Sequence, residues 1–239
     1  MSQLVQKTAS ALALFILWLT DENKRASLNN SLSRFGSSHT LSSRWKVKGN
    51  YKDIFEILFE ESKLSSWWPS VYLNVNTIDS GDRNGIGKIV SLNTKGWLPY
   101  VLHWKYRITE SLRPNGFCFE TWGDLNGKGQ WILKQNGQFV EVICQWRVRT
   151  DKPLLKLISV VLWPIIQANH QWGMKKGLES LELELRRRQA KSAAELKRIP
   201  PPPGPTTTNP LPLLFGIFAI VLLSTLRTVL VENSTKIQD

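Results

Sequence analysis

The sequence predicts an α+β fold in which a curved antiparallel sheet of six to seven strands packs against one long C-terminal helix. Three observations lead to this prediction. Residues 99–110 and 139–150 alternate between apolar and polar side chains, with the period of two that strands show. Residues 153–188 then follow with the three-and-four spacing of an amphipathic helix. Between two of the strand-like runs, Asn136–Gly137 is a strong short-range hairpin signal.

The long helix begins with favourable residues, because Asp151 supplies an acceptor and Pro153 suits a first helical turn. A long helix with one apolar stripe needs a surface to cover it, and the preceding strands provide one. The residues that we assign to the stripe are Ile166, His170, Met174, Leu178, Leu181 and Leu185.

The elements before this helix follow from local signals. Residues 45–49 alternate as an opening strand, and Asn50 caps a helix predicted over 51–61. A second short helix or turn is expected over 63–69. The remaining strands are predicted at 71–78, 86–92, 99–110, 117–123, 129–135 and 139–150.

The segments outside the domain have a different composition. Residues 1–43 read as a disordered or peripheral segment in which His39 is solvated, and the apolar run at 9–19 is too short to span a bilayer. The domain itself is predicted over 44–188. A basic and proline-rich linker follows at 189–210, and its part from 200 onward is expected to be an extended, unpacked spacer.

Residues 211–231 are predicted to be a transmembrane anchor. A helix of this length is roughly 30 Å long, the thickness of a bilayer's hydrocarbon core. The alternative is a buried core helix, but such a helix rarely follows a proline-rich spacer. Basic residues precede the segment, and the tail 232–239 carries few. The positive-inside rule therefore predicts a single-pass membrane protein with its globular domain on the cytoplasmic side.

The composition limits the classes of partner that we expect for this protein. The formal net charge of +12 favours an anionic partner, either nucleic acid or an anionic lipid surface. No nucleic-acid-binding motif is present, and the predicted anchor already accounts for the basic residues beside it, so we expect lipid and no nucleic acid. Cys118 and Cys144 lie in predicted strands without metal-ligand spacing, and we expect two buried, reduced thiols. We expect no metal and no cofactor.

No catalytic motif is apparent, and His170 is the best polar candidate inside the fold. It is either a core histidine bonded to a backbone carbonyl or to Tyr100, or a polar group that orients a ligand. Glu120 and Asp124 are the carboxylates considered as its partners. His103, by contrast, falls on the outward face of its strand.

The eleven tryptophans suggest an aromatic interior. Trp67, Trp68 and the pair Trp97–Leu98 fall in turns, where they are expected to gate a cavity or to dip into a bilayer. With His170, the remaining residues of the predicted ligand site are Tyr100, Trp104, Trp131, Trp146, Met174 and Leu178.

Six segments carry a resemblance to a known superfamily. They are KLSSWWPSVYL at 63–73, GDRNGIGK at 81–88, TKGWLPYVLHWKYR at 94–107, WGDLNGKGQW at 122–131, QWRVRTDKPLL at 145–155 and ANHQWGMKKGLESL at 168–181. With the order of elements, they resemble the START, Bet v 1 and polyketide cyclase/dehydrase proteins of the SRPBCC superfamily. The resemblance covers residues 45–188 and implies a helix-grip fold.

The resemblance implies several functions, because this superfamily contains carriers, receptors, cyclases and hydrolases. We expect a membrane-anchored domain that binds or transports a hydrophobic small molecule or lipid. One alternative is a cyclase or dehydratase that uses His170. A second alternative is a membrane adaptor whose interior is filled by its own aromatic rings.

Overall fold

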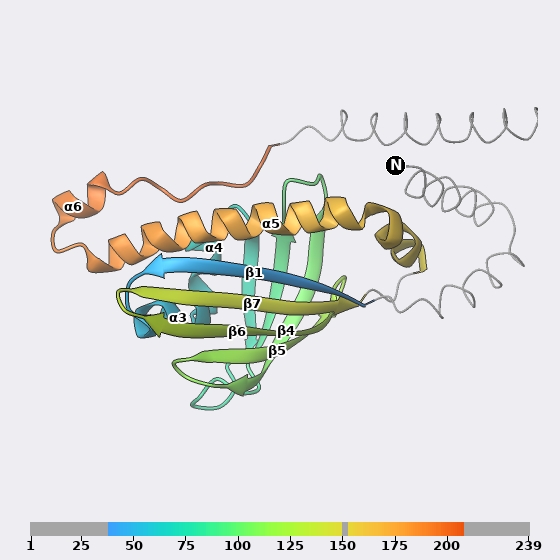
Figure 1. The fold of residues 1–239 in the computed structure, drawn as a ribbon, viewed down its shortest axis with the longest axis horizontal. Coiled ribbons are helices and arrows are strands. Elements are labelled where there is room, and N and C mark those ends of the chain that lie inside the picture. Colours follow the sequence, from blue (N-terminus) through green and yellow to red (C-terminus); the bar gives the residue numbers. More distant parts are fainter. Residues whose placement is uncertain (1–37, 150–152, 208–239) are drawn as a thin grey trace, which may run out of the picture. The chain divides into compact units, whose positions relative to one another are not determined.

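The computed structural model describes residues 38–149 and 153–207. These residues contain a seven-stranded antiparallel sheet with the strand order β1-β7-β6-β5-β4-β3-β2. Two short helices lie between β1 and β2, and a long helix follows β7 (Figure 1). The predicted α+β architecture is therefore confirmed.

The strands and helices have the following bounds. The strands are β1 Ser38–Lys48, β2 Tyr72–Asp79, β3 Ile89–Lys95, β4 Val101–Ser111, β5 Gly116–Gly123, β6 Asn126–Asn136 and β7 Phe139–Arg149. The helices are α3 Tyr51–Phe59, the 3₁₀ turn η1 Glu61–Lys63, α4 Leu64–Trp67, α5 Pro153–Gln189 and α6 Ala193–Arg198.

Helix α5 belongs to two compact units. Residues 153–166 fall in one unit, and residues 167–207 fall in the unit that contains the sheet. The predicted span of 153–188 is confirmed, and the predicted acceptor Asp151 lies outside the described residues.

The sheet begins earlier than the sequence suggested. Residues 38–43 were assigned to a disordered segment, but they extend β1 and pair with β7 from Ser38 opposite Arg149 onward. His39 is therefore half-buried in a strand rather than solvated in a tail. Polar residues form this strand because β7 supplies a complete set of backbone partners and Leu41 is buried.

The N-terminal cap of α3 and the turn between β6 and β7 form where the sequence predicted them. The side chain of Asn50 accepts a hydrogen bond from Lys52 N at 2.8 Å and caps α3. Strands β6 and β7 form a tight hairpin in which Asn136 pairs with Phe139, and Gly137 takes a φ of 58°. Glycine adopts this left-handed conformation at little cost.

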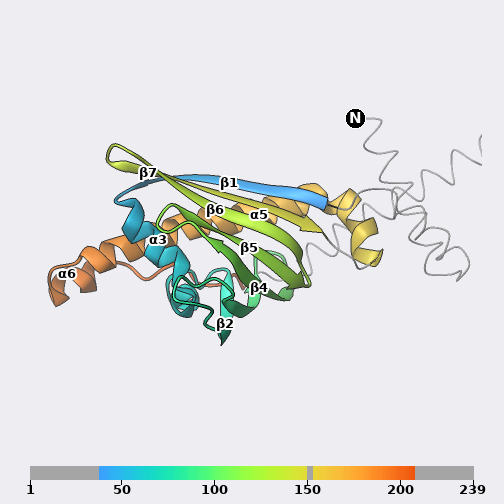
Figure 2. The same ribbon diagram turned by 90° about the horizontal axis from the view of Figure 1, so that it is seen from below.

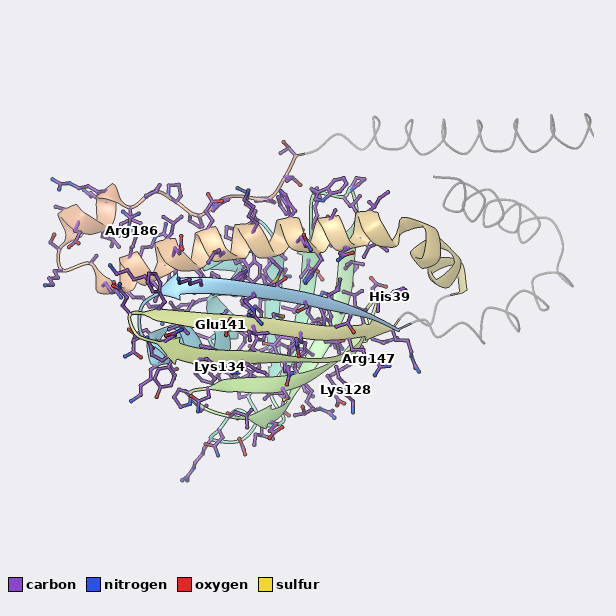
Figure 3. The ribbon with its side chains drawn as sticks, viewed as in Figure 1. His39, Lys128, Lys134, Glu141, Arg147 and Arg186 are labelled. Atoms are coloured by element: carbon purple, nitrogen blue, oxygen red, sulfur yellow. The ribbon has the colours of Figure 1, made fainter. Side chains whose placement is uncertain are left out.

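The two faces of the sheet differ in character. Figure 2 shows a twisted and curved sheet, and the burial of alternate residues identifies its inner face. Aromatic residues crowd that face, including Trp45, Trp104, Phe117, Phe119 and Trp146. Lysine and arginine are frequent on the outer face, where Figure 3 labels Lys128, Lys134 and Arg147.

The segment after α5 differs from the predicted unpacked spacer. Ser192 caps the short helix α6. Beyond it, residues 199–207 return along the domain (Figure 1) and end in contact with the loop that joins β3 to β4. The prediction of an unpacked spacer was wrong for this part of the chain. Among the described residues, no helix is long and apolar enough to cross a membrane; the predicted anchor at 211–231 lies outside them.

Candidate ligand-binding site

Helix α5 packs against the inner side of the domain through its small residues. A β-carbon on Gly177 would overlap the ring of Trp68, and one on Gly173 would meet Val71 Cγ2 at 3.3 Å. Trp68 in turn contacts Trp45, with 5.8 Å between ring centroids, and Trp45 contacts Trp131 at 5.4 Å. A chain of three tryptophans therefore links the helix to strands β1 and β6.

Trp67 and Trp68 are core residues. Both are almost completely buried, so the prediction that they gate a cavity or enter a bilayer was wrong. Trp67 lies in helix α4 and Trp68 immediately follows it, which places both rings against the core. Leu98 is buried as well, and its N–H donates to Asn169 Oδ1 of helix α5 at 3.1 Å.

A second aromatic group covers the sheet away from these three tryptophans. Trp104 and Trp146 lie 5.1 Å apart between ring centroids, and Trp146 also contacts Phe119 at 6.2 Å. The indole N–H of Trp104 donates to Thr94 Oγ1 at 2.8 Å. The structure therefore brings together two of the predicted site residues, Trp104 and Trp146, and places Trp131 in the other group.

Two polar groups beside Trp104 and Phe119 are buried without a partner. Thr121 is 5% exposed and Trp146 is 9% exposed, and neither Thr121 Oγ1 nor Trp146 Nε1 has a hydrogen-bond partner among the described residues. The residue that pairs with Thr121 on strand β6 is Gly127, which has no side chain to offer Thr121 a hydrogen bond. A buried polar group without a partner requires an explanation, such as a water or a ligand.

Thr121 was not predicted from the sequence. Its position in the alternation of β5 places it inward, beside Phe117 and Phe119. A polar residue at an inward position of an apolar strand is the signal that would have identified it.

Replacing Thr94 and replacing Thr121 with valine should change the stability of the fold differently. Replacing Thr94 with valine leaves the buried Trp104 N–H without an acceptor, which typically costs about 1–3 kcal/mol. Replacing Thr121 with valine removes a group that already lacks a partner, so the free energy of unfolding should stay the same or rise. Urea denaturation of the two variants checks this, and equal losses would contradict the assignment of Thr121.

His170 lies on helix α5 beside strand β1. Its Nε2 is 3.4 Å from Ser43 Oγ on strand β1, and burial lowers its pKa to about 4. The predicted carboxylate partners lie elsewhere: Glu120 forms an ion pair with Arg107 at 3.4 Å, and Asp124 accepts a hydrogen bond from His103 N. His170 is therefore neutral at pH 7 and has no acidic partner among these contacts.

Because the pKa of His170 is lowered, the stability of the folded domain should depend on pH. The unfolded chain takes up a proton near pH 6.5, whereas the folded chain resists it until about pH 4. The stability that this histidine contributes is thus fully present above pH 6.5 and is lost as the pH falls towards 4, by at most about 3 kcal/mol. Denaturation curves of the wild type and His170→Gln should diverge over that range. Parallel curves would contradict the burial of the ring.

The other predicted site residues have mixed surroundings. Met174 is buried on α5, whereas Leu178 is only half-buried, because the buried side of the helix runs through Gly177 and Leu181. Tyr100 precedes β4 and is 42% exposed.

The remaining sequence predictions concern His103 and the cysteines. His103 is exposed as predicted and lies 2.8 Å from Asn93 Oδ1. Cys144 is a buried free thiol whose pKa burial raises to about 12. Cys118 is free but only half-buried, because it faces outward on β5, so the expectation of burial was wrong for it. Among residues 38–149 and 153–207, no cluster of His, Cys, Asp and Glu could hold a metal ion.

Comparison with known proteins identifies the fold. No family model matches the chain, and no curated protein matches it. Among solved structures, the protein TTHA0849 from Thermus thermophilus has a TM-score of 0.54 at 12% identity, covering 64% of this chain and all of its own. A START superfamily protein from Mycobacterium smegmatis has a TM-score of 0.51 at 11% identity, covering 63% and 99%.

An enzyme also has this arrangement. The Zhui aromatase/cyclase from Streptomyces sp. R1128 has a TM-score of 0.50 at 12% identity, covering 65% of this chain and 98% of its own. The resemblance that the sequence predicted is thus confirmed at the level of the fold: the domain has the helix-grip fold of START-like and aromatase/cyclase proteins.

Proposed function

We propose that this domain binds a hydrophobic small molecule or lipid between helix α5 and the inner face of the sheet, and that it does so at a membrane. The observation that carries the proposal is the pair of buried, unpartnered polar groups on Thr121 and Trp146, set among aromatic rings. Apolar sites use a few such groups to orient a ligand that is otherwise held by contact with rings.

The ligand inferred from these groups is largely apolar with one polar end. Trp146 Nε1 is a donor only, and Thr121 Oγ1 both donates and accepts. A carbonyl or hydroxyl oxygen could accept a hydrogen bond from either group. A sterol, an isoprenoid alcohol, a quinone or a fatty acyl derivative has this combination of properties.

Binding is favoured over catalysis by the state of His170. An efficient general acid or base at neutral pH has a pKa near 7. Burial lowers the pKa of His170 to about 4, and its polar contact is the hydroxyl of Ser43. A cyclase that relied on this histidine would need a carboxylate to raise its pKa, and the two candidates have partners elsewhere.

The membrane part of the proposal rests on the sequence. Residues 211–231 have the length and apolar character of a single-pass anchor, and the basic residues before them favour a cytoplasmic domain. Anchoring would bring a carrier or sensor of poorly soluble compounds close to the lipid phase in which those compounds dissolve.

The test is to extract the full chain from membranes in mild detergent, denature it, and identify the released small molecules by mass spectrometry. One compound of the inferred class should copurify in close to equal amount with the protein. A preparation with no bound compound, and no shift in melting temperature with any member of a sterol, quinone and acyl-lipid panel, would overturn the proposal.

A further inference from the structure

We propose that residues 199–207, here called the strap, hold one end of the domain against an anionic lipid bilayer, with the loop between β3 and β4 in contact with the lipid. This inference rests on the proposed membrane anchor. It adds a defined orientation, a membrane-contacting surface and a role for the strap.

The strap is attached to the domain at both of its ends. The guanidinium of Arg187 donates to the carbonyl of Pro200. At the other end, Lys95 Nζ donates to Thr206 O at 3.1 Å, and Thr206 Oγ1 donates to Gly96 O at 3.1 Å. Between these points, residues 202 and 203 are half-buried. Proline restricts the backbone of this segment and lowers the entropic cost of keeping it in place.

The attachment of Thr206 shortens the tether to the predicted anchor. Measured from the end of α5 at Gln189, the chain to residue 211 would reach about 75 Å if it were free. Measured from Thr206, only five residue steps remain, or about 18 Å. An 11-residue strand such as β7 is about 36 Å long. The tether is therefore too short for the opposite end of the sheet to face the membrane.

The loop beside Thr206 has the composition of a membrane-contacting surface. Residues 97–101 are Trp, Leu, Pro, Tyr and Val without a charge. Tyr100 is 42% exposed and Val101 is 40% exposed. Aromatic rings of this kind favour the boundary between headgroups and acyl chains. Leu98 is held by Asn169, so the loop is fixed on α5.

The same end of the sheet is basic. Strand pairing places Lys105 opposite Trp122, Lys128 opposite Arg147, and Arg149 opposite Asn126, all near the end at which β4 begins. All four cationic residues are exposed, and Figure 3 shows Lys128 and Arg147 towards one end of the strands, with Lys134 and Glu141 towards the other. Exposed cations at the sheet end that carries an apolar loop complement anionic headgroups.

The experiment measures how deeply the loop enters the bilayer. The full chain with Cys118→Ser is labelled with an environment-sensitive fluorophore at Tyr100→Cys or, as a control, at Gln138→Cys. Gln138 is exposed and lies in the β6–β7 hairpin at the opposite end of the sheet. Both proteins are reconstituted in vesicles of phosphatidylcholine and phosphatidylserine that contain spin-labelled lipid. We expect strong quenching at position 100 and little at position 138.

Two insertions then test the strap. About twelve Gly and Ser residues after Thr207 add roughly 20 Å to the tether and should reduce quenching at position 100 to the level at position 138. The same insertion after Ala190 lies before the strap and should leave the quenching unchanged. Equal effects of the two insertions would overturn the role of the strap.

The outcomes separate this inference from the proposed anchor. Vesicle flotation reports whether the protein is in the membrane at all. Protein that floats but shows no quenching at position 100 contradicts the proposed orientation and leaves the proposed anchor intact. In that case the partner of this basic surface would be an acidic protein. Protein that fails to float contradicts both.

Discussion

Replacing Gly177 with alanine should destabilise the domain, although alanine favours helices more than glycine does. In an exposed helix this change stabilises by about 1 kcal/mol. At Gly177 the added methyl group would overlap the ring of Trp68, which is itself packed between Trp67 and Trp45 and has no room to move. Overpacking of this kind typically costs about 1–3 kcal/mol. Urea denaturation should show the loss.

Gly173 is the matched control for Gly177. It lies one turn earlier on the same helix, and its added β-carbon would meet Val71 Cγ2 at 3.3 Å, a tight contact that a shift of a few tenths of an ångström relieves. Gly173→Ala should therefore cost clearly less than Gly177→Ala. If both alanine variants were neutral, helix α5 would not be seated on Trp68 as described, and the position of the helix over the inner face would need revision.

A larger loss of stability is expected from Lys88→Met. Lys88 Nζ and Glu61 Oε2 are 2.5 Å apart, and the two side chains are only 13% and 12% exposed. The variant leaves the carboxylate of Glu61 partly buried with the hydroxyl of Thr77 as its remaining hydrogen-bond donor. Removing one partner from a buried ion pair typically costs about 3–5 kcal/mol, which thermal and urea denaturation would detect.

Two control variants test whether the loss of stability in Lys88→Met arises from the unpaired carboxylate of Glu61. Arg44→Met breaks an exposed ion pair with Glu141, and it should cost less than about 1 kcal/mol. Lys88→Met combined with Glu61→Gln removes the unpaired charge and should recover much of the stability. A double variant as unstable as Lys88→Met alone would show that the loss arises instead from the contact of the Lys88 ammonium with the Phe59 ring.

The sequence predicted those parts of the fold that local residue patterns determine. The alternation in residues 99–110 and 139–150 identified β4 and β7, and Asn50 identified the start of α3. The features that it missed depend on distant partners. Residues 38–43 form a strand only because β7 lies beside them, and the strap is held by hydrogen bonds to Lys95 and Gly96 that composition does not reveal.

The candidate site was predicted in part for the same reason. Strand periodicity correctly placed Trp104 and Trp146 on one face, where they meet. It gave no indication that Thr94 would bond Trp104 while Thr121 would lack a partner, because that difference depends on which residues lie across the sheet. The helix stripe was assigned through Leu178 instead of Gly177, since hydrophobicity does not show that a helix approaches its neighbour most closely at glycine.

The central claim is that Thr121 and Trp146 bind a ligand's polar end, and the most direct test is the amount of copurifying compound retained by Thr121→Val. Valine has nearly the same shape, and the variant should fold at least as stably as the wild type. Losing one hydrogen bond should weaken binding by about 1–2 kcal/mol, or roughly 5- to 30-fold. We therefore expect a folded protein that retains much less of the compound after equal washing. Undiminished retention by a stably folded Thr121→Val protein would contradict the account.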